Sequence, residues 1–297
     1  MHVFVTGATG FIGTAVVHEL LGAGHKLVGL ARSDEAAAKL KAAGGEAHRG
    51  ALNDLESLAE GARQADGVAH LAFNHDFSRY EENAETDRLA TAALAGALEG
   101  TGKPLVVTSG TAVLPPGRMG VETDPPTAQA RAKSELVLAW ADRGVRVSVV
   151  RLAPSVHGRG DAAFVPALVA IARDTGVSAY IGDGANRWPA VHRLDAARLF
   201  RLALERGEPG ARFHGVAEEG LPTRLIAEAI GKGLGLPVRS ISPEDAAGHF
   251  GWLAGFLQLD APASSARTRD ALGWVPTEPG LIQDMRESGY FADAGSS

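Results

Sequence analysis

The first thirteen residues constrain the fold most strongly, because they join a short apolar run to a glycine-rich turn. The run from His2 to Thr6 is apolar and partly β-branched, which is typical of a buried strand. It leads without a spacer into Gly7-Ala8-Thr9-Gly10-Phe11-Ile12-Gly13, and an amphipathic helix is predicted from Phe11 to about Leu21. Another apolar run, Lys26 to Ala31, follows. The segment therefore predicts a strand-helix-strand unit.

Each glycine of this turn has a steric role that predicts a dinucleotide site. Gly7 lets the chain turn sharply out of the strand, Gly10 leaves room for a pyrophosphate, and Gly13 lets helix and strand pack closely. The free N–H groups and the positive dipole end of the following helix favour a diphosphate. The alternative is a tight turn that binds nothing, and the flanking strand and helix argue against it.

The end of the second predicted strand indicates which dinucleotide is preferred. Arg32 lies nineteen positions after Gly13 (32 minus 13), where an acidic residue would bind the ribose 2′-hydroxyl of NAD. An arginine suits the 2′-phosphate of NADP, and Ser33 adds a hydroxyl beside it. In the alternative, Arg32 is a solvated side chain paired with Asp34 or Glu35. We expect NADP(H) to be preferred, with NAD(H) as the second choice.

Composition excludes several kinds of site and partner. The absence of cysteine rules out disulfides, thiolate nucleophiles and cysteine metal ligands, and the ten histidines show no metal-ligand spacing. A net charge of −6 gives no electrostatic reason to expect nucleic acid or an anionic membrane as a partner. No apolar run is long enough to cross a membrane and no signal peptide is recognisable, so a cytoplasmic protein is expected.

Strand-like and helix-like stretches alternate through the first half of the chain. Strands are predicted at 46–49, 67–73, 103–109 and 145–152, and helices at 35–43, from 53 or 54, at 79–99 and at 125–143. This alternation predicts an α/β fold with a Rossmann-type, doubly wound parallel sheet. Ligands bind beyond the carboxyl ends of such strands. The segments ending at Gly7, Arg32, Ala72, Ser109 and Ala153 should therefore surround one crevice.

Beyond Gly158 the pattern becomes less regular, which predicts a smaller C-terminal substrate lobe. We assign 1–157 and about 190–217 to the dinucleotide-binding domain, about 158–189 and 218–291 to the lobe, and 292–297 to a tail. Helices are expected at 162–174, 194–205, 222–234 and 243–257, and strands at 178–181 and 212–215. The candidates for substrate contact here are Arg187, Trp188, His192, Phe250 and Trp252.

Several motifs in a fixed order carry a resemblance to a known family. After the glycine turn they are His70-Leu71-Ala72, Val106-Val107-Thr108-Ser109, Arg151 to Gly158, Gly182-Asp183-Gly184 and Val191 to Ala197. Together they resemble the extended and atypical branch of the short-chain dehydrogenase/reductases, which includes epimerases and dehydratases that act on nucleotide sugars. The resemblance covers nearly the whole chain, from Met1 to about Gly289.

This resemblance implies the residues that contact the cofactor. They are Gly7, Thr9, Gly10, Phe11, Ile12, Gly13, Arg32, Ser33, Leu52, Asp54, Leu71, Ala72, Phe73, Thr108, Lys133, Pro154, Ser155 and Val156. Leu52 and Asp54 are carried over through an adenine-side turn, where Asp54 also suits a helix N-cap. Asp87 falls where relatives often have a helix asparagine. The resemblance further implies a homodimer as the candidate assembly.

The chain departs from the family in its catalytic helix. The family's Tyr-x-x-x-Lys pair sets a phenol and an ammonium one helical turn apart, and here Lys133 is kept while Gln129 replaces the tyrosine. An amide cannot act as an acid or base near neutral pH. Lys133 is expected to bind the nicotinamide ribose, and Ser109 or Thr111 to hydrogen-bond the substrate. The candidate proton donors are His157, His75, Tyr80 and His192.

Three functions are consistent with these residues. The first is an NADP(H)-dependent oxidoreductase that reduces a small carbonyl, imine or related substrate by hydride transfer. The second is a catalytically silent NADP(H)-binding regulator that has lost turnover with the tyrosine. The third is a nucleotide-sugar epimerase or dehydratase, which the missing tyrosine and Arg32 disfavour.

Overall fold

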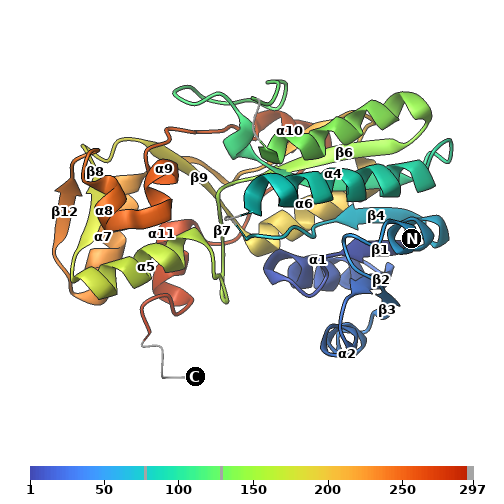
Figure 1. Cartoon of the computed structure of the whole chain (residues 1–297), viewed down its shortest axis with the longest axis horizontal. Coiled ribbons are helices and arrows are strands. Elements are labelled where there is room, and N and C mark those ends of the chain that lie inside the picture. Colours follow the sequence, from blue (N-terminus) through green and yellow to red (C-terminus); the bar gives the residue numbers. More distant parts are fainter. Residues whose placement is uncertain (77–78, 128–129, 293–297) are drawn as a thin grey trace.

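A seven-stranded parallel sheet organises the larger part of the chain, as the computed structural model shows (Figure 1). The structure describes residues 1–76, 79–127 and 130–292. The order across the sheet is β10-β6-β5-β4-β1-β2-β3. The strands are β1 (His2–Thr6), β2 (Lys26–Ala31), β3 (Glu46–Arg49), β4 (Gly67–His70), β5 (Pro104–Gly110), β6 (Arg146–Leu152) and β10 (Arg212–Gly215). The predicted doubly wound parallel sheet is confirmed.

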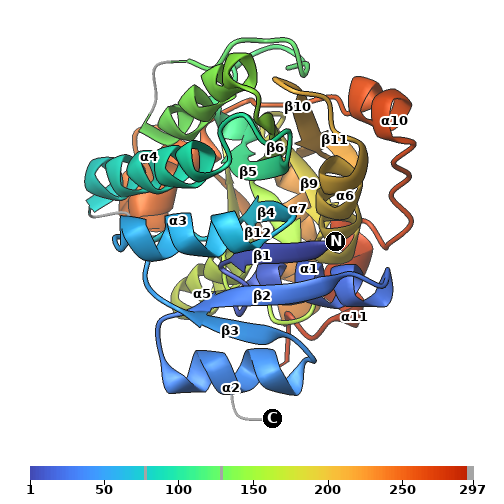
Figure 2. The same cartoon turned by 90° about the vertical axis from the view of Figure 1, so that its right-hand side faces the viewer.

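Helices cover both faces of this sheet (Figure 2). One face carries α1 (Phe11–Gly22) and α6 (Arg193–Arg206), and the other carries α3 (Leu55–Gln64), α4 (Tyr80–Ala97) and η3 (Ala130–Arg143). Side chains of a strand alternate between the faces, so Val3 and Val5 join the core under α1 and α6 while Phe4 joins the core under α3 and α4. Burial on both faces explains why β1 is apolar without interruption.

A smaller part of the molecule lies beyond the carboxyl ends of the sheet strands, on the left of Figure 1. It has its own apolar core, which includes Ile226, Ile230, Leu253 and Met285. Its strands are β7 (Ser155–His157), β8 (Ser178–Ile181), β9 (Arg187–His192), β11 (Glu218–Pro222) and β12 (Val238–Ile241). Its helices are α5 (Phe164–Thr175), α7 (Thr223–Leu234), α8 (Ala246–Phe250), η4 (Gly251–Leu253), α9 (Ala254–Leu257) and α11 (Leu281–Glu287). The residue bounds of the two domains stay a prediction.

The predicted helix at 125–143 differs from the structure at its start. Thr127 is held to Val113 O by its backbone N–H at 2.7 Å and by its hydroxyl at 2.8 Å. This tie and the two preceding prolines keep 125–127 outside the helix, and η3 is wound as a 3-10 helix from Ala130. Gln129 lies outside the described residues.

The second difference concerns the helix predicted at 243–257, which is three short helices. The chain breaks at Gly251, whose φ of +55° does not fit a continuous α-helix. The predictions also lack β7, β9, β11 and β12, because these short strands carry little alternation of apolar and polar residues. The remaining segments complete the chain: α2 (Asp34–Ala42), η2 (Thr111–Val113) and α10 (Ala266–Leu272).

Candidate dinucleotide and active site

The glycine turn has the tight geometry that its sequence predicts. Gly7 has a φ of +69°, and a Cβ placed on it would lie 2.7 Å from the backbone nitrogen of Ala72. A Cβ on Gly13 would lie 1.9 Å from Gly7 O, so no side chain fits there. The strand β1, the start of α1 and the segment after β4 therefore meet at one point because these positions are glycine.

The first turn of α1 is suited to an anion. Gly10 occupies the N-cap position, where it has no side chain to accept hydrogen bonds, and the first turn carries no acidic residue. The N–H groups of this turn and the helix dipole face the carboxyl edge of the sheet. A diphosphate group supplies the acceptors that such a turn needs.

Arg32 and Ser33 lie at the carboxyl end of β2, at the start of α2. The two carboxylates expected to compete for Arg32 are engaged elsewhere: Asp34 pairs with Arg49, and Glu35 Oε1 lies 2.7 Å from Lys39 Nζ. Within residues 1–76, 79–127 and 130–292, Arg32 has no carboxylate within 4 Å, and its side chain is exposed. Ser33 Oγ accepts the N–H of Ala36 at 3.2 Å and caps α2.

Asp54 and Leu52, which were predicted to form the adenine-side turn, both have structural roles. Asp54 Oδ1 accepts the N–H of Ser57 at 3.1 Å and caps α3, while Leu52 packs against the core under that helix. A cap of this kind stabilises a helix by about 1 kcal/mol. Contacts of either residue with an adenine stay a prediction.

A buried chain of polar side chains runs from β1 through β4 to α4. The hydroxyl of Thr6 lies 2.9 Å from His70 Nδ1, and His70 Nε2 lies 3.0 Å from Asp87 Oδ1. Thr6 Oγ1 also accepts the N–H of Ala72 at 3.2 Å, so Thr6 donates to Nδ1 and His70 donates from Nε2 to Asp87. The segment after β4 is thereby fixed to the glycine turn.

Arg131, on η3, completes this chain and was not predicted as a site residue. Its guanidinium lies 2.6 Å from Asp87 Oδ2, donates to Thr108 O at 2.7 Å, and stacks 4.3 Å above the ring of Phe73. Burial raises the pKa of Asp87, but Arg131 and His70 outweigh it and hold that pKa below its ordinary value. The unexplained Asp87 in an alanine-rich helix was the sequence signal for a buried cation nearby.

Lys133 contacts the start of α4, at Glu81, and not the buried Asp87. Its Nζ lies 3.0 Å from Glu81 Oε2, and the two side chains are 36% and 76% exposed. The predicted ribose contact of Lys133 therefore stays a prediction, whereas Arg131 reaches the carboxyl ends of β4 and β5. Arg131 and Lys133 are two positions apart in η3 and therefore contact different partners.

Ser109 and Thr111 were the two predicted candidates for the hydroxyl that hydrogen-bonds the substrate, and in the structure they have different surroundings. Ser109 Oγ donates to Glu135 Oε1 at 3.1 Å, and Glu135 also accepts from Arg151 at 2.7 Å and from Arg212 at 2.9 Å. Ser109 thus belongs to a buried structural network. Thr111 Oγ1 is fully buried and has no hydrogen-bond partner among the described residues. Ser155 Oγ, on β7, is in the same situation.

His157 and His192 lie together between the sheet and the C-terminal helices. His157 Nδ1 lies 2.8 Å from Asp284 Oδ2, and the two imidazole rings are 5.3 Å apart in an edge arrangement. His192 Nδ1 accepts the N–H of Leu194 at 3.3 Å and so caps α6. Burial and His157 lower the pKa of His192. Both rings are buried, and their role as proton donors stays a prediction.

Aromatic side chains form two clusters, one after β4 and one in the smaller part of the molecule. After β4, the ring of Phe73 lies 5.3 Å from His75 and 6.1 Å from Tyr80. In the smaller part, Phe164 lies 5.5 Å from Trp188, 5.9 Å from Trp252 and 5.3 Å from Phe256. Trp252 is 55% exposed, whereas Phe250 is buried in the core. Arg187 is paired with Asp260 through Nε at 2.9 Å and Nη2 at 2.8 Å.

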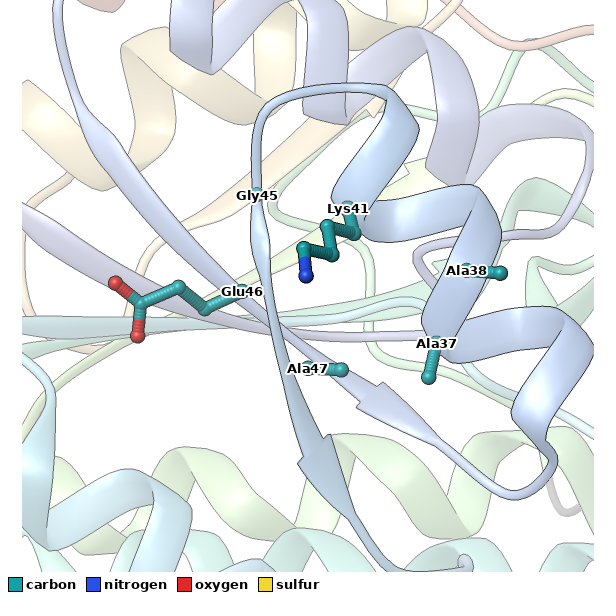
Figure 3. A pocket seen from close by; sticks show the side chains of 6 residues that line it. All are labelled: Ala37, Ala38, Lys41, Gly45, Glu46 and Ala47. Atoms are coloured by element: carbon teal, nitrogen blue, oxygen red, sulfur yellow. The ribbon is translucent and has the colours of Figure 1, made fainter.

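A hollow of about 410 Å³ lies elsewhere, between α2 and β3 (Figure 3). It is lined mainly by alanines 37, 38 and 47, and Glu46 points away from the other labelled side chains. Because Gly45 and Glu46 lie at the amino end of β3, this hollow is at the edge opposite the glycine turn. None of the predicted site residues lines it.

The described residues form neither a metal-binding cluster nor a helix able to cross a membrane. Across 1–76, 79–127 and 130–292, no group of three histidine or acidic side chains is placed to hold a metal ion. Among the helices in the same ranges, none has the length and apolar character needed to span a bilayer.

The parallel sheet, the glycine turn and the open first turn of α1 define a Rossmann-type dinucleotide-binding protein. The profile of the NAD dependent epimerase/dehydratase family matches residues 3–214, and the chain belongs to that family. The predicted resemblance to an atypical short-chain dehydrogenase/reductase is confirmed, and the chain is an NAD(P)-binding member of that superfamily.

Relatives with full-length similarity include an uncharacterized protein of Schizosaccharomyces pombe, 52% identical over 295 residues, which are 98% of this chain and 100% of the relative. A 2-alkyl-3-oxoalkanoate reductase of Stenotrophomonas maltophilia is 30% identical over 260 residues, 80% of this chain and 77% of that protein. The dTDP-glucose 4,6-dehydratase DesIV of Streptomyces venezuelae, solved with NAD and TYD, has a TM-score of 0.78 at 23% identity, covering 98% of this chain and 96% of that chain. This last likeness shows a shared fold.

Proposed function

We propose that the protein is an NADP(H)-dependent oxidoreductase that reduces a small carbonyl compound, an imine or a related substrate. The observation that carries the proposal is the hydroxyl of Thr111, which is fully buried at the carboxyl end of β5 and has no partner among the described residues. A buried polar group without a partner is costly, so a ligand that hydrogen-bonds to it accounts for its presence. The oxygen or nitrogen of a substrate double bond is such a ligand.

The residues at the strand ends fit a dinucleotide cofactor, which would supply the hydride. Gly10 and the first turn of α1 leave room and N–H groups for a diphosphate. Arg32 and Ser33, at the end of β2, are assigned to a 2′-phosphate. Arg131 uses only part of its five N–H donors on Asp87 and Thr108 and is assigned to the ribose in place of Lys133. The buried hydroxyl of Ser155 provides a further donor.

Tyr80 is the proton donor in this proposal. Burial raises its pKa, as do Glu81 and Asp87, whereas Arg131 lowers it, and the net shift is upward. A phenol with a raised pKa keeps its proton near neutral pH and can give it to the oxygen anion that forms when a carbonyl is reduced. Tyr80 is the first residue of α4, and its ring lies 6.1 Å from that of Phe73, the ring on which the Arg131 guanidinium stacks.

The substrate is proposed to be apolar around its reacting group. The half-buried Phe164 and Phe256 and the exposed Trp252 offer aromatic surface in the smaller part of the molecule, where Phe164 also packs on the buried Trp188. Arg187, which lies next to Trp188 in sequence, is neutralised by Asp260. These contacts favour an alkyl or aryl carbonyl compound over a nucleotide sugar, whose diphosphate needs unpaired cations. The similarity to a 2-alkyl-3-oxoalkanoate reductase supports the same class.

The test is NADPH oxidation by the purified protein with a panel of alkyl and aryl ketones, 3-oxo acids and cyclic imines. We expect the wild type to reduce at least one apolar member of the panel. Tyr80→Phe and Thr111→Val should each reduce that compound at least tenfold more slowly. Glu60→Gln, on the exposed face of α3, is the matched control and should leave the rate unchanged. Tight NADPH binding without turnover across the panel would overturn the proposal and favour the cofactor-binding regulator.

A further inference from the structure

Arg193 is an arginine near the glycine turn that neither the motif nor the family resemblance assigns. It is the first residue of α6, 180 positions after Gly13 (193 minus 13). Its guanidinium carbon lies 5.1 Å from the centroid of the Phe11 ring, and Phe11 is the first residue of α1. Two helix starts from distant parts of the chain are thereby brought together beside the turn.

The stem of Arg193 is held in place by Gly158. A Cβ added to Gly158 would lie 3.1 Å from Arg193 Cγ and 3.2 Å from Cδ, so the absence of a side chain makes room for the arginine. Gly158 directly follows β7, the strand that carries Ser155. Arg193 therefore spans from the end of β7 to the start of α1.

Among the described residues Arg193 forms no ion pair, and its guanidinium contacts only the ring of Phe11. Arg198 and Arg201, on the same helix, pair with acidic residues, namely Asp195 and Glu278 for the first and Glu19 and Glu205 for the second. No carboxylate of the described chain lies within 4 Å of the Arg193 guanidinium. A half-buried arginine that keeps its whole donor fork beside an open helix start is suited to a phosphate oxygen.

We propose that Arg193, supported by Phe11 and Gly158, binds the diphosphate of the dinucleotide together with the first turn of α1. The two ends of the cofactor then depend on different arginines: Arg193 holds the diphosphate that NADPH and NADH share, and Arg32 holds the 2′-phosphate that only NADPH has. This assignment does not require turnover, so it stands apart from the proposed reductase activity.

The experiment is calorimetric titration of the full chain with NADPH, NADH and adenosine 2′-monophosphate. Arg193→Gln should weaken the binding of NADPH and of NADH by the same factor, about tenfold or more. The binding of adenosine 2′-monophosphate should be unchanged, because that nucleotide has no diphosphate. Arg32→Ala should weaken the binding of NADPH and of adenosine 2′-monophosphate and leave the binding of NADH unchanged. Arg193→Lys keeps the positive charge but lacks the forked donors of the guanidinium, so its dinucleotide affinity should lie between those of the wild type and Arg193→Gln.

Arg206→Gln is the matched control, because it removes the same charge from the exposed last residue of the same helix. It should bind all three nucleotides like the wild type. The proposal is overturned if Arg193→Gln binds both dinucleotides like Arg206→Gln, if it weakens NADPH alone, or if the wild type binds neither dinucleotide. A wild-type protein that binds both dinucleotides but reduces no member of the substrate panel would instead contradict the reductase proposal and leave this one standing.

Discussion

Arg131 and Asp87 are in direct contact, with Nη1 2.6 Å from Oδ2, although they are 44 positions apart in the sequence. Asp87 is 1% exposed and Arg131 is 14% exposed, so the pair is nearly closed to solvent. His70 shares the carboxylate and Phe73 covers the guanidinium. The contact therefore joins η3 to α4 and, through His70, to the end of β4, where the cofactor is expected.

Removing Asp87 should destabilise the protein. Asp87→Ala leaves the buried Arg131 cation without its partner and His70 without its acceptor, which costs about 3 to 5 kcal/mol in free energy of unfolding. Urea unfolding measures this value. Glu85→Ala, on the same helix, removes an exposed carboxylate that pairs with Arg88 and should leave the unfolding midpoint unchanged. Equal effects of the two variants would show that the buried pair does not stabilise the fold.

Thr111 and Ser109 should respond differently to loss of their hydroxyls. Thr111→Val removes the unpartnered hydroxyl and is expected to lower kcat/KM about a hundredfold without lowering the free energy of unfolding, since a buried hydroxyl without a partner is itself costly. Ser109→Ala removes one of several donors to Glu135, which keeps Arg151 and Arg212, and should cost about 1 kcal/mol of stability with little change in rate. The opposite pattern would return the substrate contact to Ser109.

Lys133 and Arg131 can be compared as ligands of the cofactor ribose. Arg131→Met should weaken NADPH binding about tenfold or more, because it removes a cation at the ends of β4 and β5. Lys133→Ala loses a solvent-exposed pair with Glu81 and should bind NADPH like the wild type. Equilibrium titration of both variants is the measurement. Loss of binding in Lys133→Ala alone would support the ribose role that the family resemblance implies.

The sequence was most informative where function depends on short-range geometry. Strand β1, the glycine turn and helix α1 are contiguous, and their steric demands can be read from Gly7 and Gly13 alone. Residues that act through distant partners were less accessible. Arg131 was missed because its contacts with Asp87 and Thr108 depend on how η3 packs on the sheet. Since the start of this helix was uncertain, the sequence could not show which of its residues face the sheet. Asp284, which holds His157 from 127 positions away, was missed for the same reason.

Stability should fall in mild acid, with His214 as one cause. His214 is fully buried on β10; its Nδ1 lies 2.7 Å from Ser264 O and therefore donates, while Nε2 faces Arg151 at 3.4 Å. Burial lowers the pKa of His214 and Arg151 lowers it further, against the opposing effects of Glu122, Glu135 and the Ser264 carbonyl.

The pH window follows from the direction of that shift. The unfolded chain binds the His214 proton near pH 6.5, and the folded chain binds it only at lower pH, so the free energy of unfolding decreases as the pH falls below about 6.5. His214→Asn keeps a donor for Ser264 but does not titrate, and it should lose less stability than the wild type over that window. Urea unfolding above and below the window measures both slopes. Identical slopes would mean that His214 keeps its ordinary pKa in the folded protein, because the other histidines are the same in both chains.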